Sequence, residues 1–437
     1  MALTKVNTGL IDPIGIADLS ATGSPGSTTF LRGDNTWAAA GGGSTFAGDI
    51  TVNGLTVGKG ANAVATNTVL GDDALDAAVT GGSNIAVGKT ALGASTSGNR
   101  NVAVGEQAMG TGVNTGQKNI AIGYKAGLPI TSGVRNVIIG DEAGLAMTTG
   151  GTNTVVGTDA GKAIVTTGDN AIFGNEAGKV TTTTITAFGA FAGHDHVDGY
   201  SNTFIGRYAG RDVTNGHSST AVGHAALLTA TTAVTNTTVG TNSMRLTTTG
   251  SDNTAVGFEA MDKNTTGANN TAVGEGALFS NTTANDNTAV GRDSLGANTT
   301  GTKNTAVGKS SMAACTTGVE NTIMGFEAGD AITTGGSNTG VGRSALGSTT
   351  TGSSNVGIGR SALSTNISGE QNTAIGRGAL QAVNTGGNNT GIGKDAGVAL
   401  TSGASNVMIG IEAGDEQTTT LHNTVIGAEA GQKHTSG

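Results

Sequence analysis

The sequence Asn253-Thr-Ala-Val-Gly257 recurs without change as Asn270–Gly274, Asn287–Gly291 and Asn304–Gly308, so that four glycines follow one another at a constant spacing of seventeen positions. A fixed period of this length is typical of stacked supersecondary units. The register extends both ways to 22 copies, with glycine at positions 71, 88, 105, 123, 140, 157, 174, 189, 206, 223, 240, 257, 274, 291, 308, 325, 342, 359, 376, 393, 410 and 427. Of the intervals between them, all but two equal this period; one is longer by a single position (105 to 123) and one is shorter by two (174 to 189).

Each copy follows one pattern when positions are counted from its glycine, position 0. Position −4 is Asn in 20 of 22 copies, position −3 is Thr, Val or Ile in all but one, position −1 is always apolar, and position +3 is Ala or Ser. Alternating β-branched residues predict a short strand that ends at the glycine, and the small residues after it predict a tight corner followed by a second short strand. Stacked Asn side chains are expected to form an amide ladder. The residues that define this structural repeat are Asn253, Val256, Gly257 and Ala260, and in the next copy Asn270, Val273, Gly274 and Ala277.

Two later positions vary together. Position +4 is Leu or Met in 12 copies and Gly in the other 10, and position +7 is large and apolar in 6 of those 10, as in Ile130 and Met147. Where position +4 is Leu or Met, position +7 is small or polar in 11 of 12 copies. We infer that the two side chains compete for one pocket, since close packing rejects two large side chains there.

The composition supports a narrow core. The chain of 437 residues has 76 glycines, 3% aromatic and 12% charged residues, which is too few large side chains for a wide globular interior. Disordered segments lack apolar residues at such regular positions. The predicted fold is therefore all-β, a parallel β-solenoid (β-roll) of about 22 seventeen-residue coils, with residues 67–437 as the repeats, 51–66 as a capping coil and 1–50 as an N-terminal attachment segment and linker.

The strand carries apolar residues at both position −2 and position −1 in most copies, as in Ile138-Ile139. Adjacent strand residues face opposite sides, so one face points inward and the other needs a partner. A repeating face is matched most simply by a copy of itself, which predicts self-association. At ~4.8 Å per coil, 22 coils would form a rod of roughly 105 Å.

Residues 1–50 do not repeat. Leu10–Ile16 is expected to be a short strand or docking segment, Ser20–Thr28 a loop, and Ala38–Ser44 a hinge. Arg32-Gly33-Asp34 matches an adhesion motif, but a match of three residues has little specificity, and we favour a simple turn between Leu31 and Trp37.

Few residues suggest chemistry. His194 and His196, with acidic neighbours, are weak candidates for a metal site; an exposed loop that bulges where two residues are missing is the simpler interpretation. Cys315 is expected to be a small filler of its coil. The His residues are scattered, no nucleophile elbow or P-loop is present, and the acidic residues mostly follow the glycine on a solvated face, so we expect no enzyme, no cofactor and no resident metal.

The formal charge of −9 argues against nucleic-acid partners. No apolar run reaches the length that a membrane-spanning helix requires, and Met1–Val6 lacks the apolar core of a secretory signal, so a soluble protein without membrane insertion is expected. The chain ends at Gly437 within a coil, and we expect another protein, or a partner in an assembly, to cover that end.

The repeat Asn-Thr-Ala-Val-Gly-x-x-Ala over residues 67–437 resembles the coil of YadA-like trimeric adhesin heads, with units about three residues longer. Ala21-Thr-Gly-Ser-Pro25 with Thr29-Phe-Leu-Arg-Gly-Asp-Asn-Thr-Trp37, and Gly48-Asp-Ile-Thr-Val-Asn-Gly-Leu-Thr-Val57, are similar to segments of bacteriophage tail-fibre proteins. Together these resemblances imply a left-handed homotrimer in the virion, made in the host cytoplasm. They also imply attachment to tail or baseplate proteins through residues 1–50 and contact with a receptor or glycan on the host surface.

Three functions follow as hypotheses. The leading one is a tail-fibre shaft and receptor-binding protein. A cell-surface trimeric adhesin is the alternative, which an anchor encoded downstream would favour. Ice binding by Thr arrays ranks last, because most outer Thr residues are expected to lie beside Gly in turns.

Overall fold

The computed structural model describes residues 29–31, 37–39, 49–53 and 55–431. The predictions for Leu10–Ile16, Ser20–Thr28 and the Arg32-Gly33-Asp34 motif lie outside these residues, as do residues 40–44 of the expected hinge and the last residues of the chain. At the N-terminal side, β1 (Thr29–Leu31) pairs antiparallel with β2 (Trp37–Ala39), and Leu31 is opposite Trp37.

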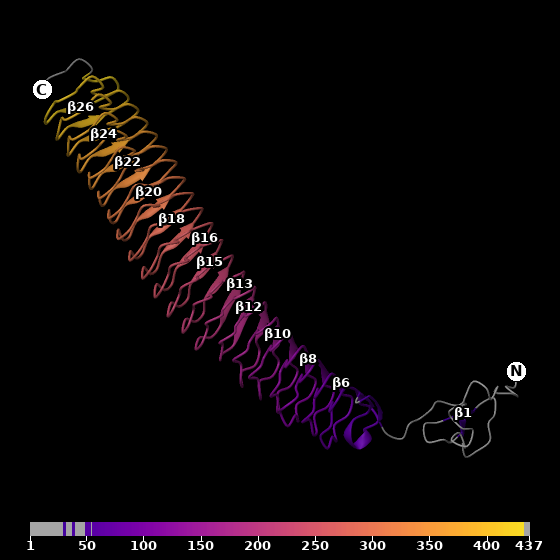
Figure 1. The fold of residues 1–437 in the computed structure, drawn as a ribbon. Coiled ribbons are helices and arrows are strands. Elements are labelled where there is room, and N and C mark those ends of the chain that lie inside the picture. Colours follow the sequence, from indigo (N-terminus) through magenta and orange to yellow (C-terminus); the bar gives the residue numbers. More distant parts are fainter. Residues whose placement is uncertain (1–28, 32–36, 40–48, 54, 432–437) are drawn as a thin grey trace, which may run out of the picture.

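The repeats form a parallel β-solenoid, as the 17-residue period predicts. Twenty-two strands, β5 to β26, pair in sequence order as one continuous parallel ladder, and together they build a long, gently curved rod (Figure 1). Each coil returns the chain to the next rung, so neighbours in the sheet are also neighbours in the sequence. The contacts are therefore local along the axis, as expected of a quasi-one-dimensional fold.

The ladder strands are three residues long, or four in β12 and β13, and each ends just before its repeat glycine. Their bounds are β5 Thr68–Leu70, β6 Ile85–Val87, β7 Val102–Val104, β8 Ile120–Ile122, β9 Val137–Ile139, β10 Thr154–Val156, β11 Ala171–Phe173, β12 Ile185–Phe188, β13 Asn202–Ile205, β14 Thr220–Val222, β15 Thr237–Val239, β16 Thr254–Val256, β17 Thr271–Val273, β18 Thr288–Val290, β19 Thr305–Val307, β20 Thr322–Met324, β21 Thr339–Val341, β22 Val356–Ile358, β23 Thr373–Ile375, β24 Thr390–Ile392, β25 Val407–Ile409 and β26 Thr424–Ile426.

The first edge of the ladder is covered by a hairpin. Strands β3 (Ile50–Val52) and β4 (Leu55–Gly58) pair antiparallel around Asn53, whose φ is 50°, and β4 then pairs antiparallel with β5. A short 3-10 turn, η3 (Ala61–Ala63), leads into the first coil. Residues 51–66, predicted as a capping coil, are thus a hairpin and a turn.

Each coil contains one strand, and the predicted second strand is wrong. After the glycine, positions +2 and +4 have left-handed backbone, as at Glu259 and Met261, where φ is 54° at both. A left-handed residue cannot extend a strand. The turn still stacks on its neighbours through backbone hydrogen bonds, because the Met261 N–H donates to the carbonyl of Ala277 at 2.9 Å. Coils are therefore bonded to each other even where they are not strands.

The amide ladder is confirmed. The Asn at position −4 is buried in nearly every coil. In the coil of Asn270, its backbone N–H donates to Oδ1 of Asn253 at 3.0 Å, and its Nδ2 donates to the same oxygen at 3.1 Å and to the Ala284 carbonyl at 2.9 Å. One side chain thereby pairs polar groups of three successive coils. Each of these buried groups would cost free energy if it were left unpaired.

The apolar interior is formed by positions −2, +3, +4 and +7. Ala260 and Ala277 at position +3 are fully buried, as are Leu or Met at position +4 wherever they occur. Where position +4 is Gly, another large side chain fills the space: a Cβ on Gly161 would lie 2.8 Å from Cδ1 of Ile164 at position +7 and 3.2 Å from Val155 at position −2. The competition for one pocket is therefore confirmed, and position −2 takes part in it.

Candidate binding surfaces of the rod

Two surfaces of the rod carry the side chains that could meet a partner. The outward side of the ladder, which we call the sheet face, consists of positions −3 and −1 of every coil. The neighbouring charged edge consists of positions +1, +2 and +5. Both run the length of the solenoid because the register does not drift: Thr254 pairs with Thr271 and Val256 with Val273.

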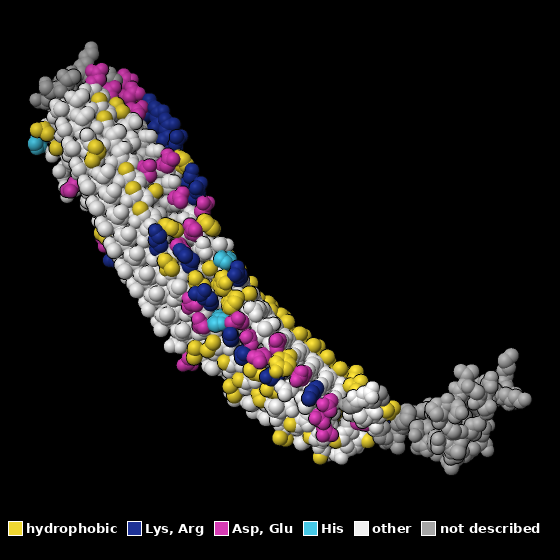
Figure 2. Space-filling view, viewed as in Figure 1, with side chains coloured by type: hydrophobic (Ala, Val, Ile, Leu, Met, Phe, Trp, Pro, Cys, Tyr) yellow, Lys and Arg dark blue, Asp and Glu magenta, His cyan; other side chains and the backbone are white. Residues whose placement is uncertain are grey.

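The sheet face is uncharged and partly apolar in all 22 coils. Its position −1 residues are half-exposed, with 36% of Val256, 37% of Val273 and 38% of Ile358 accessible. Figure 2 shows hydrophobic side chains in a row along one edge of the N-terminal half. Singly exposed valines are ordinary on a protein surface, whereas a contiguous apolar strip indicates an interaction site.

The sheet face also carries a row of hydroxyls. Position −3 is Thr in ten consecutive coils, from β12 to β21, and these residues are partly exposed beside the apolar position −1. We predicted that most outer Thr residues lie beside Gly in turns, whereas these ten lie on strands and form a continuous array. The signal for it was present in the Thr-Ala-Val motif, because strand residues two apart share a face.

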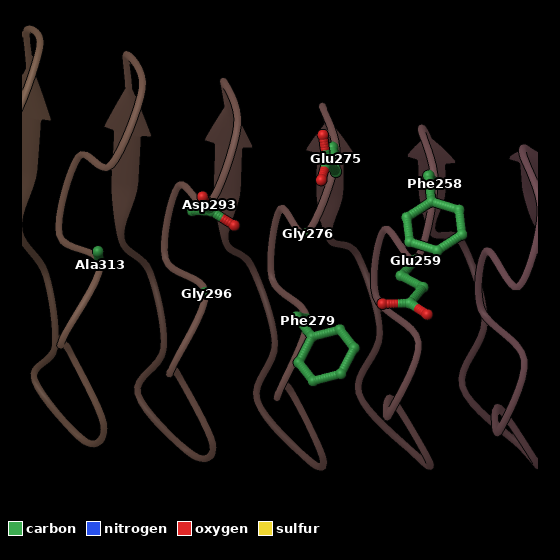
Figure 3. Close-up of a pocket in the computed structure, with 8 residues that line it drawn as sticks. All are labelled: Phe258, Glu259, Glu275, Gly276, Phe279, Asp293, Gly296 and Ala313. Atoms are coloured by element: carbon green, nitrogen blue, oxygen red, sulfur yellow. The ribbon is translucent and has the colours of Figure 1, made fainter.

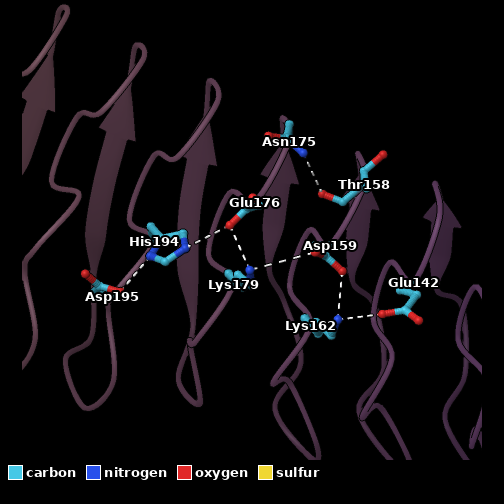
Figure 4. A network of polar contacts seen from close by, with 9 residues as sticks. All are labelled: Glu142, Thr158, Asp159, Lys162, Asn175, Glu176, Lys179, His194 and Asp195. Atoms are coloured by element: carbon cyan, nitrogen blue, oxygen red, sulfur yellow. Dashed lines mark hydrogen bonds and ion pairs between the residues drawn. The ribbon is translucent and has the colours of Figure 1, made fainter.

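The charged edge holds an ion-pair network that links successive coils. Lys162 Nζ lies 2.5 Å from Glu142 and 2.9 Å from Asp159, and the hydrogen bond to Glu142 is the main reason that the pKa of Lys162 is raised. Lys179 continues the row with Glu176, whose pKa it lowers by donating a hydrogen bond. The residues drawn in Figure 4 are Glu142, Thr158, Asp159, Lys162, Asn175, Glu176, Lys179, His194 and Asp195. Ion pairs at such partly exposed sites each contribute little free energy.

A surface hollow of about 380 Å³ opens on this edge where glycines replace larger side chains (Figure 3). Its walls combine phenyl rings and carboxylates, and they are formed by Phe258, Glu259, Glu275, Gly276, Phe279, Asp293, Gly296 and Ala313. Such a set favours a cation. One wall residue already contacts a cation of the chain, because Nζ of Lys263 lies 4.5 Å from the ring centroid of Phe279.

The structure separates the two candidate metal ligands. His196 is fully buried at position +7, where its Nε2 meets Nδ2 of Asn202 at 2.8 Å, and burial lowers its pKa to about 4. His194 lies on the charged edge, 3.1 Å from Glu176 and 2.6 Å from Asp195. The two rings do not converge on one point. Over the described part of the chain, no three His, Cys, Asp or Glu side chains form a group that could hold a metal ion.

The shortened coil is not the exposed bulge that we expected. Strand β12 pairs in register with β11 and β13, so this coil is two residues shorter without a change in the strand pairing. Ile185, buried at position −4, replaces Asn there, and its N–H donates to Oδ1 of Asn170 at 2.8 Å. The register of the rod therefore continues through residues 174–206.

Cys315 occupies the interior position predicted for it. Its thiol is fully buried at position +7, and burial raises its pKa to about 11. A thiol of this kind is a weak nucleophile, because the thiolate is the reactive form. Of the repeat residues, Asn253 and Ala260 likewise belong to the interior, and Gly257 forms the corner of the coil.

No helix within the described residues has the length and apolar character needed to cross a membrane. Comparison of the chain with protein-family models, with curated proteins and with solved structures gave no match.

Proposed function

We propose that the chain is a structural fibre protein: the shaft of a bacteriophage tail fibre, which spans a distance as a rod and meets the host surface with its exposed edges. The uninterrupted ladder of 22 parallel strands is the observation that carries this proposal. A solenoid of this kind supplies length and a repeated surface and needs no catalytic groove. The tail-fibre assignment itself comes from the sequence resemblance of residues 21–25, 29–37 and 48–57.

Self-association into a homotrimer is part of the proposal, with the sheet face as the contact. With about 4.8 Å per coil and about 3.3 Å per strand residue, the face measures about 100 Å by 7 Å, or about 700 Å² per chain. In a cyclic trimer each chain divides this area between two neighbours, about 350 Å² to each, and the whole assembly buries about 2,100 Å². The face has no charge to desolvate, and identical copies in parallel present the same spacing to each other.

The test is the mass and shape of the assembly. Wild-type protein is expected to have the mass of three chains by light scattering and to form thin rods with three-fold symmetry in electron micrographs. Replacing Val256, Val273 and Val290 together with Lys charges the sheet face, and we expect monomers. The matched control places Lys at Thr266, Thr283 and Thr300, which are exposed in the same three coils at position +9, and should stay trimeric. A monomeric wild type would contradict the assembly proposal.

One observation favours a second candidate, ice binding. The ten consecutive Thr residues of the sheet face, each followed two residues later by an apolar residue that is at least partly exposed, form a regular array of hydroxyl and methyl groups. This face cannot be buried in a trimer and also be open to ice. Thermal hysteresis of the purified protein would support the second candidate, and its absence would remove it.

A further inference from the structure

In the C-terminal half of the rod, the residue directly after the repeat glycine is a cation in six of seven consecutive coils. We call this set the basic column: Arg292, Lys309, Arg343, Arg360, Arg377 and Lys394. Phe326 is the one interruption. Figure 2 shows Lys and Arg side chains gathered along one edge near the C-terminal end. The whole chain has a formal charge of −9, so the column is a local reversal of charge.

The middle of the column is not neutralised by the chain itself. Its ends are paired: Arg292 lies 3.3 Å from Asp293, and Lys394 lies 2.9 Å from Glu412. Arg377, next to Lys394 in the column, is paired as well, because its Nη2 lies 3.2 Å from the Asp395 carboxylate. The ion pairs formed by the described residues, at N to O distances of up to 4.0 Å, do not include Lys309, Arg343 or Arg360.

These central cations stay open to a ligand. Arg343 and Arg360 are exposed, and the guanidinium of Arg343 lies 6.0 Å from the ring centroid of Phe326. From residue 343 to residue 395 the sequence has four cations and two carboxylates. Glu370 lies in another column, and Asp395 pairs with Arg377 and Lys394, so Arg343 and Arg360 carry the unpaired positive charge. A surface with this excess of positive charge attracts anions.

A hollow of about 180 Å³ lies within the column. It is lined by Arg360, Ser361, Arg377, Gly378, Gln381 and Asp395. The hollow depends on Gly378, because a Cβ there would collide with the Asp395 carboxylate. It places the guanidinium groups of Arg360 and Arg377 beside a hydroxyl and an amide. Asp395 already pairs with Arg377, so Arg360 is the cation left for the anionic group of a sugar, whose hydroxyls the neutral polar groups can bind.

We propose that the basic column binds a linear anionic polysaccharide, whose carboxylate or sulfate groups lie along the rod. At about 4.8 Å per coil, the six cations span about 29 Å in single file. An open row of this kind fits an extended polymer better than a small molecule, which binds in a concave pocket. Small hydroxyl residues at position +2, such as Ser344 and Ser361, leave room for sugar rings next to the cations.

The spacing of the cations favours a polysaccharide over a nucleic acid. Duplex DNA carries one charge per about 1.7 Å of axis, or about 17 charges over the same 29 Å. Six cations on a chain of net charge −9 cannot match that density. A polysaccharide with one charge per sugar, or per few sugars, has a charge density that the six cations of the basic column can match. Binding of a polyanion does not depend on the proposed fibre function. Only the further statement that this polysaccharide belongs to the host surface rests on that proposal.

The experiment measures binding of the full-length chain to immobilised polygalacturonate and to dextran sulfate, with neutral dextran and single-stranded poly-dT as comparisons. The test variant replaces Arg343, Arg360 and Arg377 together with Gln. The matched control replaces Arg100, Lys118 and Arg135 with Gln, which removes the same charge from three exposed residues of consecutive coils in another column. Light scattering and electron microscopy of each sample report the assembly separately.

We expect wild type to bind at least one of the two polyanions and not dextran, and the two polyanions separate carboxylate from sulfate recognition. The test variant should lose about tenfold or more in affinity, whereas the control variant should keep its affinity. The inference is overturned by absence of binding to both polyanions, by equal losses in the two variants, or by equal or tighter binding to poly-dT. Intact trimers that bind no polyanion overturn this inference alone, and monomers that bind it overturn the assembly proposal alone.

Discussion

At the scale of the residue, position +4 carries the tightest constraint in the coil. Its backbone is left-handed whether the residue is Leu, Met or Gly, with φ of 51° at Leu278 and 56° at Gly144. A side chain there is disfavoured by about 1–2 kcal/mol, and burial of Leu or Met offsets that cost. Glycine avoids the backbone cost, but the space then has to be filled from position +7 or −2. The two residue types are alternative solutions of one packing problem.

Gly144→Leu tests this rule. The space above Gly144 holds Met147 Cε and Ile138 Cγ2, each 3.5 Å from the position of an added Cβ, so the rest of a Leu side chain would overpack the coil. We expect a loss of about 1–3 kcal/mol in the free energy of unfolding. Adding Met147→Ala should restore part of it, and urea denaturation of both variants measures the difference. Equal stability of wild type and Gly144→Leu would contradict the rule.

Asn287→Ala tests the amide ladder. The Asn287 side chain accepts the Asn304 N–H at 2.9 Å and donates to the Gly301 carbonyl at 2.9 Å. Ala would leave the Asn304 N–H without this acceptor, whereas the Gly301 carbonyl keeps its hydrogen bond from Asn298. The expected cost is about 1–3 kcal/mol. Asn287→Ser should cost less, because the natural Ser219 accepts the Asn236 N–H at 3.2 Å from the same position. Hydrogen exchange of residues 287–304 would report the change, and equal effects of Ala and Ser would argue against the ladder.

His196 is expected to make the stability of its coil depend on pH. Burial lowers the pKa of His196 to about 4 from an unfolded value near 6.5, so the unfolded chain binds a proton more readily than the folded one. The contribution of neutral His196 is present above pH 6.5 and is lost as the pH falls toward 4, by roughly 3 kcal/mol at most.

Melting curves at pH 7 and pH 5 measure this effect. His196→Leu places an apolar residue at position +7 beside Gly193, as in six other coils, and should weaken the response to acid. Other carboxylates titrate in both proteins, so the difference between them is the informative quantity. An equal drop in melting temperature for the two proteins would exclude His196 as the cause.

At the scale of the element, the coil is one short strand and one stacked turn. The sequence predicted the strand because its residues alternate between inward and outward faces, as in Thr254-Ala255-Val256, where Ala255 is buried. It did not predict the turn correctly. The residues of Gly257–Met261 have no strong turn signal besides the glycine, and their left-handed backbone is stabilised by hydrogen bonds to the neighbouring coils, which a single repeat does not reveal.

Removing one whole coil tests the independence of this element. Deletion of residues 270–286 joins Asn269 to Asn287 and leaves every remaining residue at its own repeat position. Because coils interact only with their neighbours, we expect a folded rod whose melting temperature changes by no more than about 3 °C. Deletion of residues 270–278 alone shifts the pattern and should prevent folding of the adjoining coils. Circular dichroism of both proteins provides the comparison.

At the scale of the whole molecule, the rod is a row of similar units, so its stability is expected to vary along the axis. Interior coils have two neighbours, whereas the terminal coils have one. Hydrogen exchange should therefore be slowest in the amides of coils 253–308 and faster toward β26, since local opening follows the number of stabilising contacts. Uniform exchange along the rod would indicate a single cooperative unit.

The candidate surfaces were only partly predictable. The sequence indicated that one face of the strand needs a partner, because apolar residues occupy both position −2 and position −1. It also singled out His194 and His196, but His196 is buried inside the coil and His194 lies on the charged edge. The basic column was missed, because Arg343, Arg360 and Arg377 are each a full repeat apart and look isolated along the chain.

The sequence by itself determined the period, the strand and the interior of each coil. Those features are set by residues within one repeat of each other, through alternation of side chains and exclusion of volume. The tertiary structure alone decided which residues become neighbours on the surface, because the about 4.8 Å between coils brings together side chains that the chain keeps a full repeat apart. The tertiary structure also decided the turn conformation, because the turn is stabilised by hydrogen bonds that join neighbouring coils.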